Sequence, residues 1–205
     1  MLGNLNIEGS DRGFPTTAVG VRCDDGGCLR IEDNVITGRG GIDSWGIHLG
    51  VSGTFVSGNR ISGGCSSTSA TGIYAEGSYA RIENNFVRGY DATQCATGTT
   101  AMVRTSVAMQ VVAFPGANEV DVHSNTFEAS AGSGGCSAIG LWLQAMAGAT
   151  PGPHGVFRND IFHAAGCGGG MNFVVREDSA LADPRIFEHD DLDPTGGPVL
   201  YMDEG

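Results

Sequence analysis

The chain repeats one short pattern of apolar and polar residues. The segment "IEDNVITG" (31–38) returns as "VSGNRISG" (56–63) and as "IENNFVRG" (82–89), each with an apolar residue, two spacers, an Asn, one spacer and a second apolar residue. We expect two short strands that meet at a bend with the Asn on it, since Asn tolerates the left-handed backbone of such a bend. The Asn positions are Asn34, Asn59, Asn85, Asn125 and Asn159, and Asp190 takes the same place in "IFEHDDLDP".

An alternating segment precedes each of these pairs. It reads "GVRC" (20–23), "GIHL" (46–49), "GIYA" (72–75), "AMQV" (108–111), "GLWL" (140–143) and "GMNF" (170–173), with a final copy in "VLYMDEG". Alternation with a period of two predicts strands. A unit of three short strands cannot bury its apolar face alone, so the units are expected to stack as parallel coils about 4.8 Å apart. The Asn side chains would then hydrogen-bond from coil to coil as a ladder.

The six agreeing copies resemble the right-handed parallel β-helix repeat family, which includes the pectate-lyase-like proteins. The resemblance covers residues from about Leu5 to Tyr201. It implies an all-β, right-handed, single-stranded parallel β-helix of six to seven three-strand coils, with essentially no α-helix, as a single domain over 1–205. The fold hosts lyases, hydrolases, epimerases, phage tailspikes and non-catalytic surface proteins, so the resemblance does not select an activity.

The outward residues of the alternating strands predict a ligand groove. Their inward neighbours are Val21, Ile47, Ile73, Met109, Leu141 and Met171. The outward row itself is Arg22, His48, Tyr74, Gln110, Trp142 and Asn172, with Tyr201 as an extension. In polysaccharide-active enzymes of the resembling family this row lines the substrate groove. Ring faces stack on sugars and the polar groups hydrogen-bond, although outward strand positions are commonly polar and aromatic residues favour strands in any case.

The next outward positions offer a catalytic constellation. They hold Asp24, Gly50, Glu76, Val112, Gln144 and Val174. Asp24 and Glu76 would be two coils apart, roughly 9–10 Å, with His48 between them. That separation is near the one that inverting glycosidases use. The alternative is that both are solvated surface carboxylates.

Lyase chemistry and metal binding have less support in the residues. The chain contains no lysine, which removes every lyase type that needs a lysine base. Arg22 lies beside Asp24, but no dense acidic pocket is predicted on the strands. The acidic stretch "EHDDLDP" (188–194) is interpreted as a solvated turn. We therefore expect no cofactor and no metal site, with Ca²⁺ in loops as the alternative.

Composition restricts the partners and the compartment. The formal net charge is −12, so nucleic acid is an unfavourable partner. No stretch approaches the roughly 20 apolar residues of a membrane span. An even count of 6 cysteines among Gly-rich loops favours disulfides and an extracellular or cell-surface location, with free thiols as the alternative. The expected pairs join near neighbours: Cys23 with Cys28, Cys65 with Cys95, and Cys136 with Cys167.

Three functions follow from these observations. The first, which we favour, is a non-catalytic extracellular module that binds carbohydrate along the outward row. The second is a polysaccharide-active enzyme, a glycoside hydrolase or lyase. The third is a self-stacking or filament-forming module, because the chain starts and stops on repeat strands with no capping helix. The first residues read as a strand already under way, so we expect a longer chain with flanking repeats or end-to-end self-association.

Overall fold

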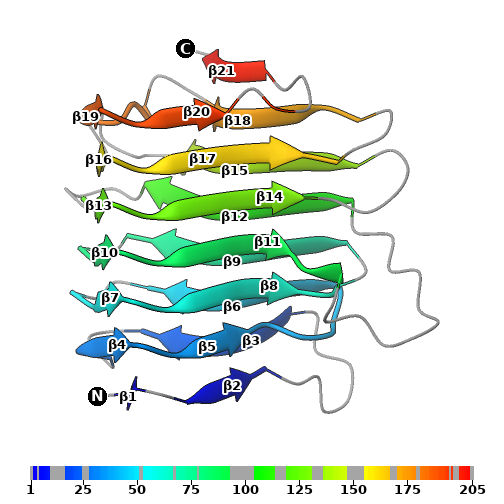
Figure 1. Ribbon diagram of the computed structural model, residues 1–205, viewed down its shortest axis with the longest axis vertical. Coiled ribbons are helices and arrows are strands. Elements are labelled where there is room, and N and C mark those ends of the chain that lie inside the picture. Colours follow the sequence, from blue (N-terminus) through cyan, green and yellow to red (C-terminus); the bar gives the residue numbers. More distant parts are fainter. Residues whose placement is uncertain are drawn as a thin grey trace.

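The computed structural model describes most of the repeat pattern. It covers residues 2–3, 5–9, 17–24, 28–50, 53–66, 68–77, 79–92, 104–113, 119–130, 136–146, 155–166, 170–178, 181–193, 195 and 199–203. Every element in these ranges is a β-strand. The strands form three seven-stranded sheets in which every third strand along the chain belongs to the same sheet, so the chain makes seven coils (Figure 1). Expectation and structure therefore agree on an all-β parallel β-helix.

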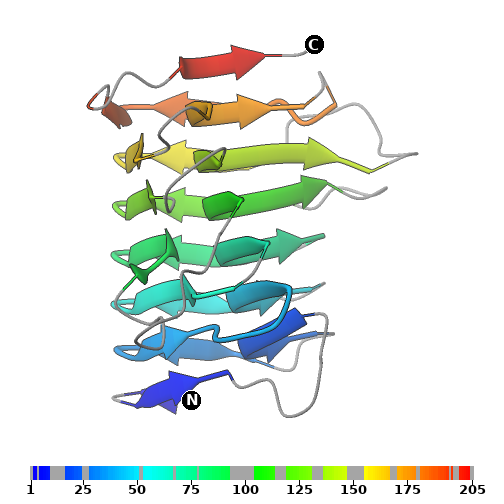
Figure 2. The same cartoon turned by 90° about the vertical axis from the view of Figure 1, so that its right-hand side faces the viewer.

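Each coil contributes one strand to each sheet. The first sheet contains β1 (Leu2–Gly3), β4 (Arg30–Glu32), β7 (Phe55–Ser57), β10 (Arg81–Glu83), β13 (Asp121–His123), β16 (Val156–Arg158) and β19 (Ile186–Glu188). The second contains β2 (Asn6–Glu8), β5 (Val35–Thr37), β8 (Arg60–Gly64), β11 (Phe86–Tyr90), β14 (Thr126–Ser130), β17 (Ile161–Ala165) and β20 (Asp191–Asp193). The third has the longest strands, β3 (Thr17–Cys23), β6 (Asp43–Leu49), β9 (Ser69–Glu76), β12 (Thr105–Ala113), β15 (Ser137–Ala145), β18 (Asn172–Glu177) and β21 (Val199–Asp203). Figure 2 shows the coils as parallel layers with the two chain ends on opposite sides of the stack.

The interior is a continuous column of apolar side chains. Each coil sends one residue inward from each side of the bend, such as Ile82 and Val87, and both are fully buried. From the fifth coil onward the column contains aromatic rings, with Phe127 and Phe162 stacked at 4.9 Å between ring centroids. Burial of this column is the main stabilising term of the fold, because a single coil has no other way to remove its apolar face from water.

A ladder of side-chain amides joins successive coils, as predicted. The backbone N–H of Asn34 donates to Oδ1 of Asn59 at 2.9 Å, and the same bond recurs from Asn59 to Asn85 and from Asn85 to Asn125. The amide nitrogens of Asn59, Asn85 and Asn125 also each donate to a carbonyl of their own coil and to one of the preceding coil, as Asn85 does with Glu83 and Val56. The ladder thus satisfies buried backbone groups that face no strand partner at the bend.

The fifth rung corrects the sequence prediction. The rung is Asp160 and not Asn159, since the backbone N–H of Asn125 donates to Oδ1 of Asp160 at 2.7 Å. Asp160 in turn donates its N–H to Asp190, so the predicted place of Asp190 is confirmed. The larger side chains Phe157 and Phe162 pack in the interior column, in the places predicted for Val156 and Ile161. The repeat in this coil is therefore shifted by one residue toward the C-terminus, and the rung shifts with it.

The left-handed residue of the bend is also displaced from the prediction. It precedes the rung by one residue in each coil, and Asn159 occupies this position with φ 55°. The other members are Asp33, Gly58, Asn84, Ser124 and His189. The rungs are therefore used for their amide groups, and the tolerance of Asn for positive φ matters only at Asn84 and Asn159.

The third strand of the sixth coil begins later than expected. Asn172 pairs with Ala138, and Val175 takes the inward place opposite Leu141 that had been assigned to Met171. Met171 is 65% exposed. The segment "GMNF" begins with a glycine followed by alternating residues, as the other copies do, and this likeness caused the error. In the other copies the glycine is required by space, since a Cβ on Gly46 would lie 2.7 Å from the carbonyl oxygen of Gly72.

One predicted disulfide is complete within the described residues. Cys23 and Cys28 form a disulfide bond at a sequence separation of 5. Cys65 and Cys136 are disulfide-bonded as well, whereas their predicted partners, Cys95 and Cys167, lie outside the described residues. None of the cysteines that the structure describes is a free thiol. The disulfide prediction is thus confirmed for Cys23–Cys28, and the pairings of the other four cysteines stay predictions.

Candidate functional site

The outward row is present on the third sheet, but its last two places are held by residues other than the predicted ones. Strand pairing aligns Arg22, His48, Tyr74, Gln110 and Trp142 in register from β3 to β15. In the sixth coil the aligned residue is Arg176, not Asn172, and in the seventh it is Met202, not Tyr201. The next outward place in the sixth coil is held by Asp178, because Val174 is fully buried. We use the term outward row for Arg22, His48, Tyr74, Gln110, Trp142 and Arg176.

A buried histidine lies between two carboxylates at the N-terminal half of this row. His48 is only 5% exposed although its strand position faces outward. Its Nε2 lies 3.3 Å from Oε2 of Glu76, and its Nδ1 lies 3.5 Å from Oδ1 of Asp24. The three side chains that the sequence proposed as a catalytic set are therefore brought together. Asp24 is held further by Arg22, whose Nε donates to Oδ2 at 2.5 Å.

Aromatic rings cover the histidine from one side. Trp45 stacks on Tyr74 with ring centroids 4.5 Å apart and 5° between planes, and it lies 5.0 Å from the His48 ring. Burial, and secondarily the charge of Glu76, raises the pKa of Tyr74 to about 12, so its hydroxyl is neutral at physiological pH. Sequence reasoning missed Trp45, because the row was defined by alternation after the glycine and Trp45 comes just before it.

The C-terminal half of the row is organised around Asp178. The indole N–H of Trp142 donates to Oδ2 of Asp178 at 2.8 Å, and Gln144 donates to the same oxygen at 3.0 Å. Arg176 donates to the other carboxylate oxygen at 2.7 Å, and its guanidinium lies 5.0 Å from the centroid of the Trp142 ring. Gln110 extends this network by donating to Gln144. Four neighbouring side chains are thus fixed in orientation before any ligand arrives.

A second apolar cluster supports this half from below. Val107, Ile139 and Phe173 are buried on the outer side of the third sheet, apart from the interior column, and Trp142 and Met202 pack against them. Trp142 is therefore half-buried and not a free surface ring. The prediction of an outward Trp142 is correct in direction, but the ring also has a packing role.

The Asp24, His48 and Glu76 side chains at one end of the row could transfer a proton. The rings and amide groups along the rest of the row could stack on a ligand and hydrogen-bond to it. Asp24 and Glu76 are two coils apart, which is roughly 9–10 Å by strand spacing. Such a separation is near the one that inverting glycosidases use, but here the imidazole of His48 fills the space between the two carboxylates. Within the described residues no three His, Cys, Asp or Glu side chains are grouped so that they could hold a metal ion.

Neither sequence nor structure comparison identifies a relative. No protein-family model, no curated protein and no solved structure matches this chain. Within the part of the chain that the structure describes, no helix is long and apolar enough to cross a membrane.

Proposed function

We propose that this chain is a non-catalytic, extracellular or cell-surface β-helix module that binds a polysaccharide along the outward row. The observation that carries the proposal is the alignment of Tyr74, Gln110 and Trp142 in three consecutive coils, with ring and amide groups fixed by their neighbours. Groups that are ordered beforehand lose little entropy on binding, and that loss is what weakens most carbohydrate recognition.

The charges of the row favour a neutral polysaccharide over a polyuronate. Asp24, Glu76 and Asp178 place carboxylates along its length, and the chain carries a net charge of −12. A polyanion would meet repulsion over its whole length. The guanidinium groups of Arg22 and Arg176 do not offset this repulsion, because they are already paired with Asp24 and Asp178 beside the row.

A glycan array combined with an activity screen on neutral and acidic polysaccharides tests the proposal. Specific binding without turnover supports it. New reducing or unsaturated ends would identify a polysaccharide-active enzyme of the kind found among pectate-lyase-like proteins. A defined filament or oligomer without any glycan signal would favour a self-stacking structural module.

Replacement of Trp142 by Ala should weaken glycan binding. The loss of one large ring contact is expected to cost about 1–3 kcal/mol of binding free energy, measured by titration calorimetry with the best array hit. Because the ring also packs on Val107 and Ile139, the free energy of unfolding should fall as well.

The matched control is Phe55→Ala, which removes a ring that lies beneath Arg30 on the first sheet. It should reduce stability without changing glycan affinity. If Trp142→Ala and Phe55→Ala bind the glycan equally well, the outward row is ordinary strand surface.

The second candidate function is glycoside hydrolysis, and one specific observation favours it. His48 is buried between Asp24 and Glu76 and contacts both, and strand spacing puts these two carboxylates roughly 9–10 Å apart, near the separation of an inverting pair. If turnover is found, Glu76→Gln should lower kcat by at least a hundredfold, because an amide can neither donate nor accept the catalytic proton. Glu83→Gln, which alters a carboxylate paired with His123 on the first sheet, is the control. Equal turnover by both variants would remove this candidate.

A further inference from the structure

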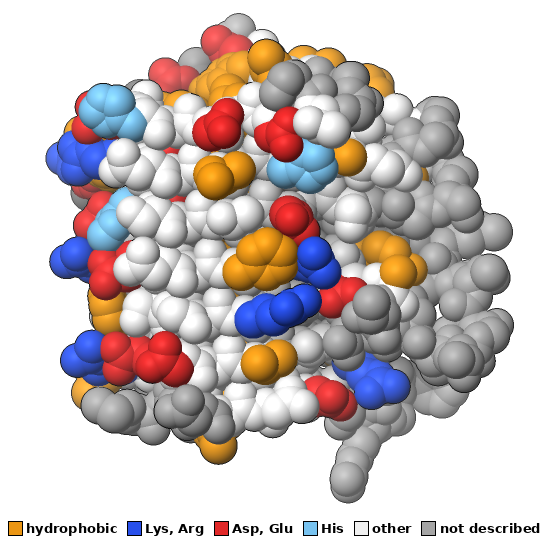
Figure 3. Space-filling model, in the orientation of Figure 1, with side chains coloured by type: hydrophobic (Ala, Val, Ile, Leu, Met, Phe, Trp, Pro, Cys, Tyr) orange, Lys and Arg blue, Asp and Glu red, His pale blue; other side chains and the backbone are white. Residues whose placement is uncertain are grey.

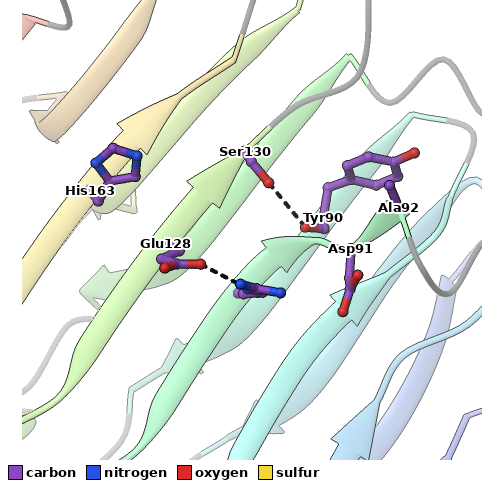
Figure 4. A pocket seen from close by; sticks show the side chains of 7 residues that line it. Tyr90, Asp91, Ala92, Glu128, Ser130 and His163 are labelled. Carbon is purple, nitrogen blue, oxygen red and sulfur yellow. Dashed lines mark hydrogen bonds and ion pairs between the residues drawn. The ribbon is translucent and has the colours of Figure 1, made fainter. Parts of the chain in front are cut away.

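A pocket opens on the outer face of the second sheet, away from the outward row of the third sheet. It measures about 370 Å³, within the usual size range of small-molecule sites. Its walls come from three neighbouring strands, β11, β14 and β17, and from the residues that follow β11 (Figure 4). The polar lining consists of Arg88, Tyr90, Asp91, Glu128, Ser130 and His163.

One ion pair and one histidine–carboxylate contact position the side chains of this pocket. Strand pairing places Arg88, Glu128 and His163 side by side on successive coils. Arg88 donates through Nε to Glu128 at 2.8 Å, and His163 lies with Nδ1 3.0 Å from a carboxylate oxygen of Asp193. Figure 3 shows basic and acidic side chains next to each other on this face. These contacts restrict the rotation of the Arg88 and His163 side chains before a ligand binds.

These contacts leave hydrogen-bonding atoms unused. Among the contacts within the described part of the chain, the two terminal amino groups of Arg88, the Oε1 atom of Glu128 and both ring nitrogens of His163 have no hydrogen-bond partner. Ser130 donates to the carbonyl oxygen of Tyr90 only at 3.5 Å, a weak bond. Donors and acceptors thus converge on one small space.

The mixture of charges selects the ligand. A phosphate or carboxylate would be repelled by Asp91 and Glu128, and a metal cation by Arg88. A neutral polyol meets neither penalty, since each hydroxyl both donates and accepts, and two adjacent hydroxyls match a guanidinium or a carboxylate. The Tyr90 ring adds an apolar wall beside these groups.

We propose that this pocket binds a single neutral pyranose residue. The site is separate from the outward row and does not depend on it: the two lie on different sheets and share no residue. A chain with both sites holds one glycan along the third sheet and a second sugar on the second sheet.

The test is a titration of ¹⁵N-labelled protein with methyl glucoside, methyl galactoside and methyl mannoside, followed by NMR. At least one should shift the Nε–H signal of Arg88 and the backbone amides of Glu128 and His163. Glu128→Gln and Arg88→Gln should each weaken that binding at least tenfold, since each removes groups that face the sugar. Trp142→Ala should leave it unchanged, which separates this site from the outward row. Glu32→Gln, in the exposed Arg30–Glu32 pair, is the matched control.

Three outcomes would overturn the proposal. The first is that no neutral glycoside shifts these signals at tens of millimolar. The second is that methyl glucuronide or glucose 6-phosphate binds more tightly than the neutral sugars, which would mean an anion site. The third is that Glu128→Gln and Arg88→Gln bind as well as the Glu32→Gln control. Both pocket variants alter partly exposed groups, so their folding is checked first by thermal unfolding.

Discussion

Replacing Asn85 by Ala should lower the free energy of unfolding by about 3–6 kcal/mol, a large share of the total for a domain. The amide of Asn85 donates to the carbonyl oxygens of Val56 and Glu83, and its oxygen accepts the backbone N–H of Asn59. Alanine leaves all three groups buried without a partner, and each such group costs roughly 1–3 kcal/mol. Urea unfolding followed by circular dichroism measures the change.

The control for this experiment is Thr126→Ala in the neighbouring coil. Thr126 points outward from β14 next to the rung Asn125, so its loss should change stability by no more than about 0.5 kcal/mol. Asn85→Asp is a second informative variant, because it keeps the acceptor oxygen, removes the donor and adds a carboxyl group whose ionisation in this buried place costs further stability. An Asn85→Ala protein as stable as Thr126→Ala would mean that the ladder contributes nothing beyond backbone pairing.

The opposite effect is expected at the fifth rung, where Asp160→Asn should stabilise the protein at pH 8 by about 2–4 kcal/mol. Asp160 is 1% exposed, and its Oδ1 accepts the backbone N–H of Asn125. Burial raises its pKa from 3.8 to about 7, against the lowering effect of the bonds from Asn125. Asparagine removes the buried charge. It also restores a donor for carbonyl groups like those that Asn125 contacts.

The sign of the pH dependence follows from the raised pKa. Below about pH 4 the carboxyl is protonated in both the folded and the unfolded chain, so its full contribution to stability is present. As the pH rises to about 7 the unfolded chain ionises more readily than the folded one, and this contribution is lost. The advantage of Asp160→Asn over the wild type should therefore grow between pH 4 and pH 8.

Unfolding curves of both proteins at several pH values measure this difference, with Asp191→Asn as the control. Asp191 is exposed on β20, so its replacement should give a small effect without this pH profile. A constant difference between Asp160→Asn and the wild type from pH 4 to pH 8 would show that the pKa of Asp160 is not raised in the folded protein.

The fold was predictable because each coil repeats the same physical problem. The period of the Asn-centred pattern predicted the rungs Asn34, Asn59, Asn85 and Asn125, and the alternation predicted the outward places of His48, Tyr74 and Gln110. In these coils apolar positions, turn residues and rung agree, so an error of one residue would break several rules at once.

The errors arose where the chain offers two readings of the same local pattern. Around Asn159 and Asp160 both alignments place apolar residues on either side, and only the packing of large rings in the column decides between them. In the sixth coil the inward place beyond Val175 holds Glu177 instead of an apolar residue. Its pKa is raised to about 7, mainly by burial and by Asp183. A rule based on apolar alternation cannot find a strand that buries a carboxyl group.

The side-chain geometry of the candidate site could not be predicted from the sequence, for a different reason. The stacking of Trp45 on Tyr74 and the bonds around Asp178 are made between coils and sideways across a strand. Strand pairing fixes which Cα atoms are neighbours, but it leaves the side-chain torsions open. The burial of His48 and the separate cluster beneath Trp142 depend on those torsions, so residue spacing alone did not predict them.

We expect the change from amide to carboxylate rungs to divide the coils into two groups of different local stability. In a solenoid each coil touches only its neighbours, so partial opening can begin at one side and stop within the stack. Asp160 and Asp190 both have raised pKa values, about 7 and about 6, mainly because Asp160 is buried and Asp190 is half-buried. In mildly alkaline solution the coils that carry them should exchange their amide hydrogens earlier than the coils joined by Asn34, Asn59 and Asn85. All coils should then stay closed in mild acid, and opening should begin at the coils of Asp160 and Asp190 as the pH rises.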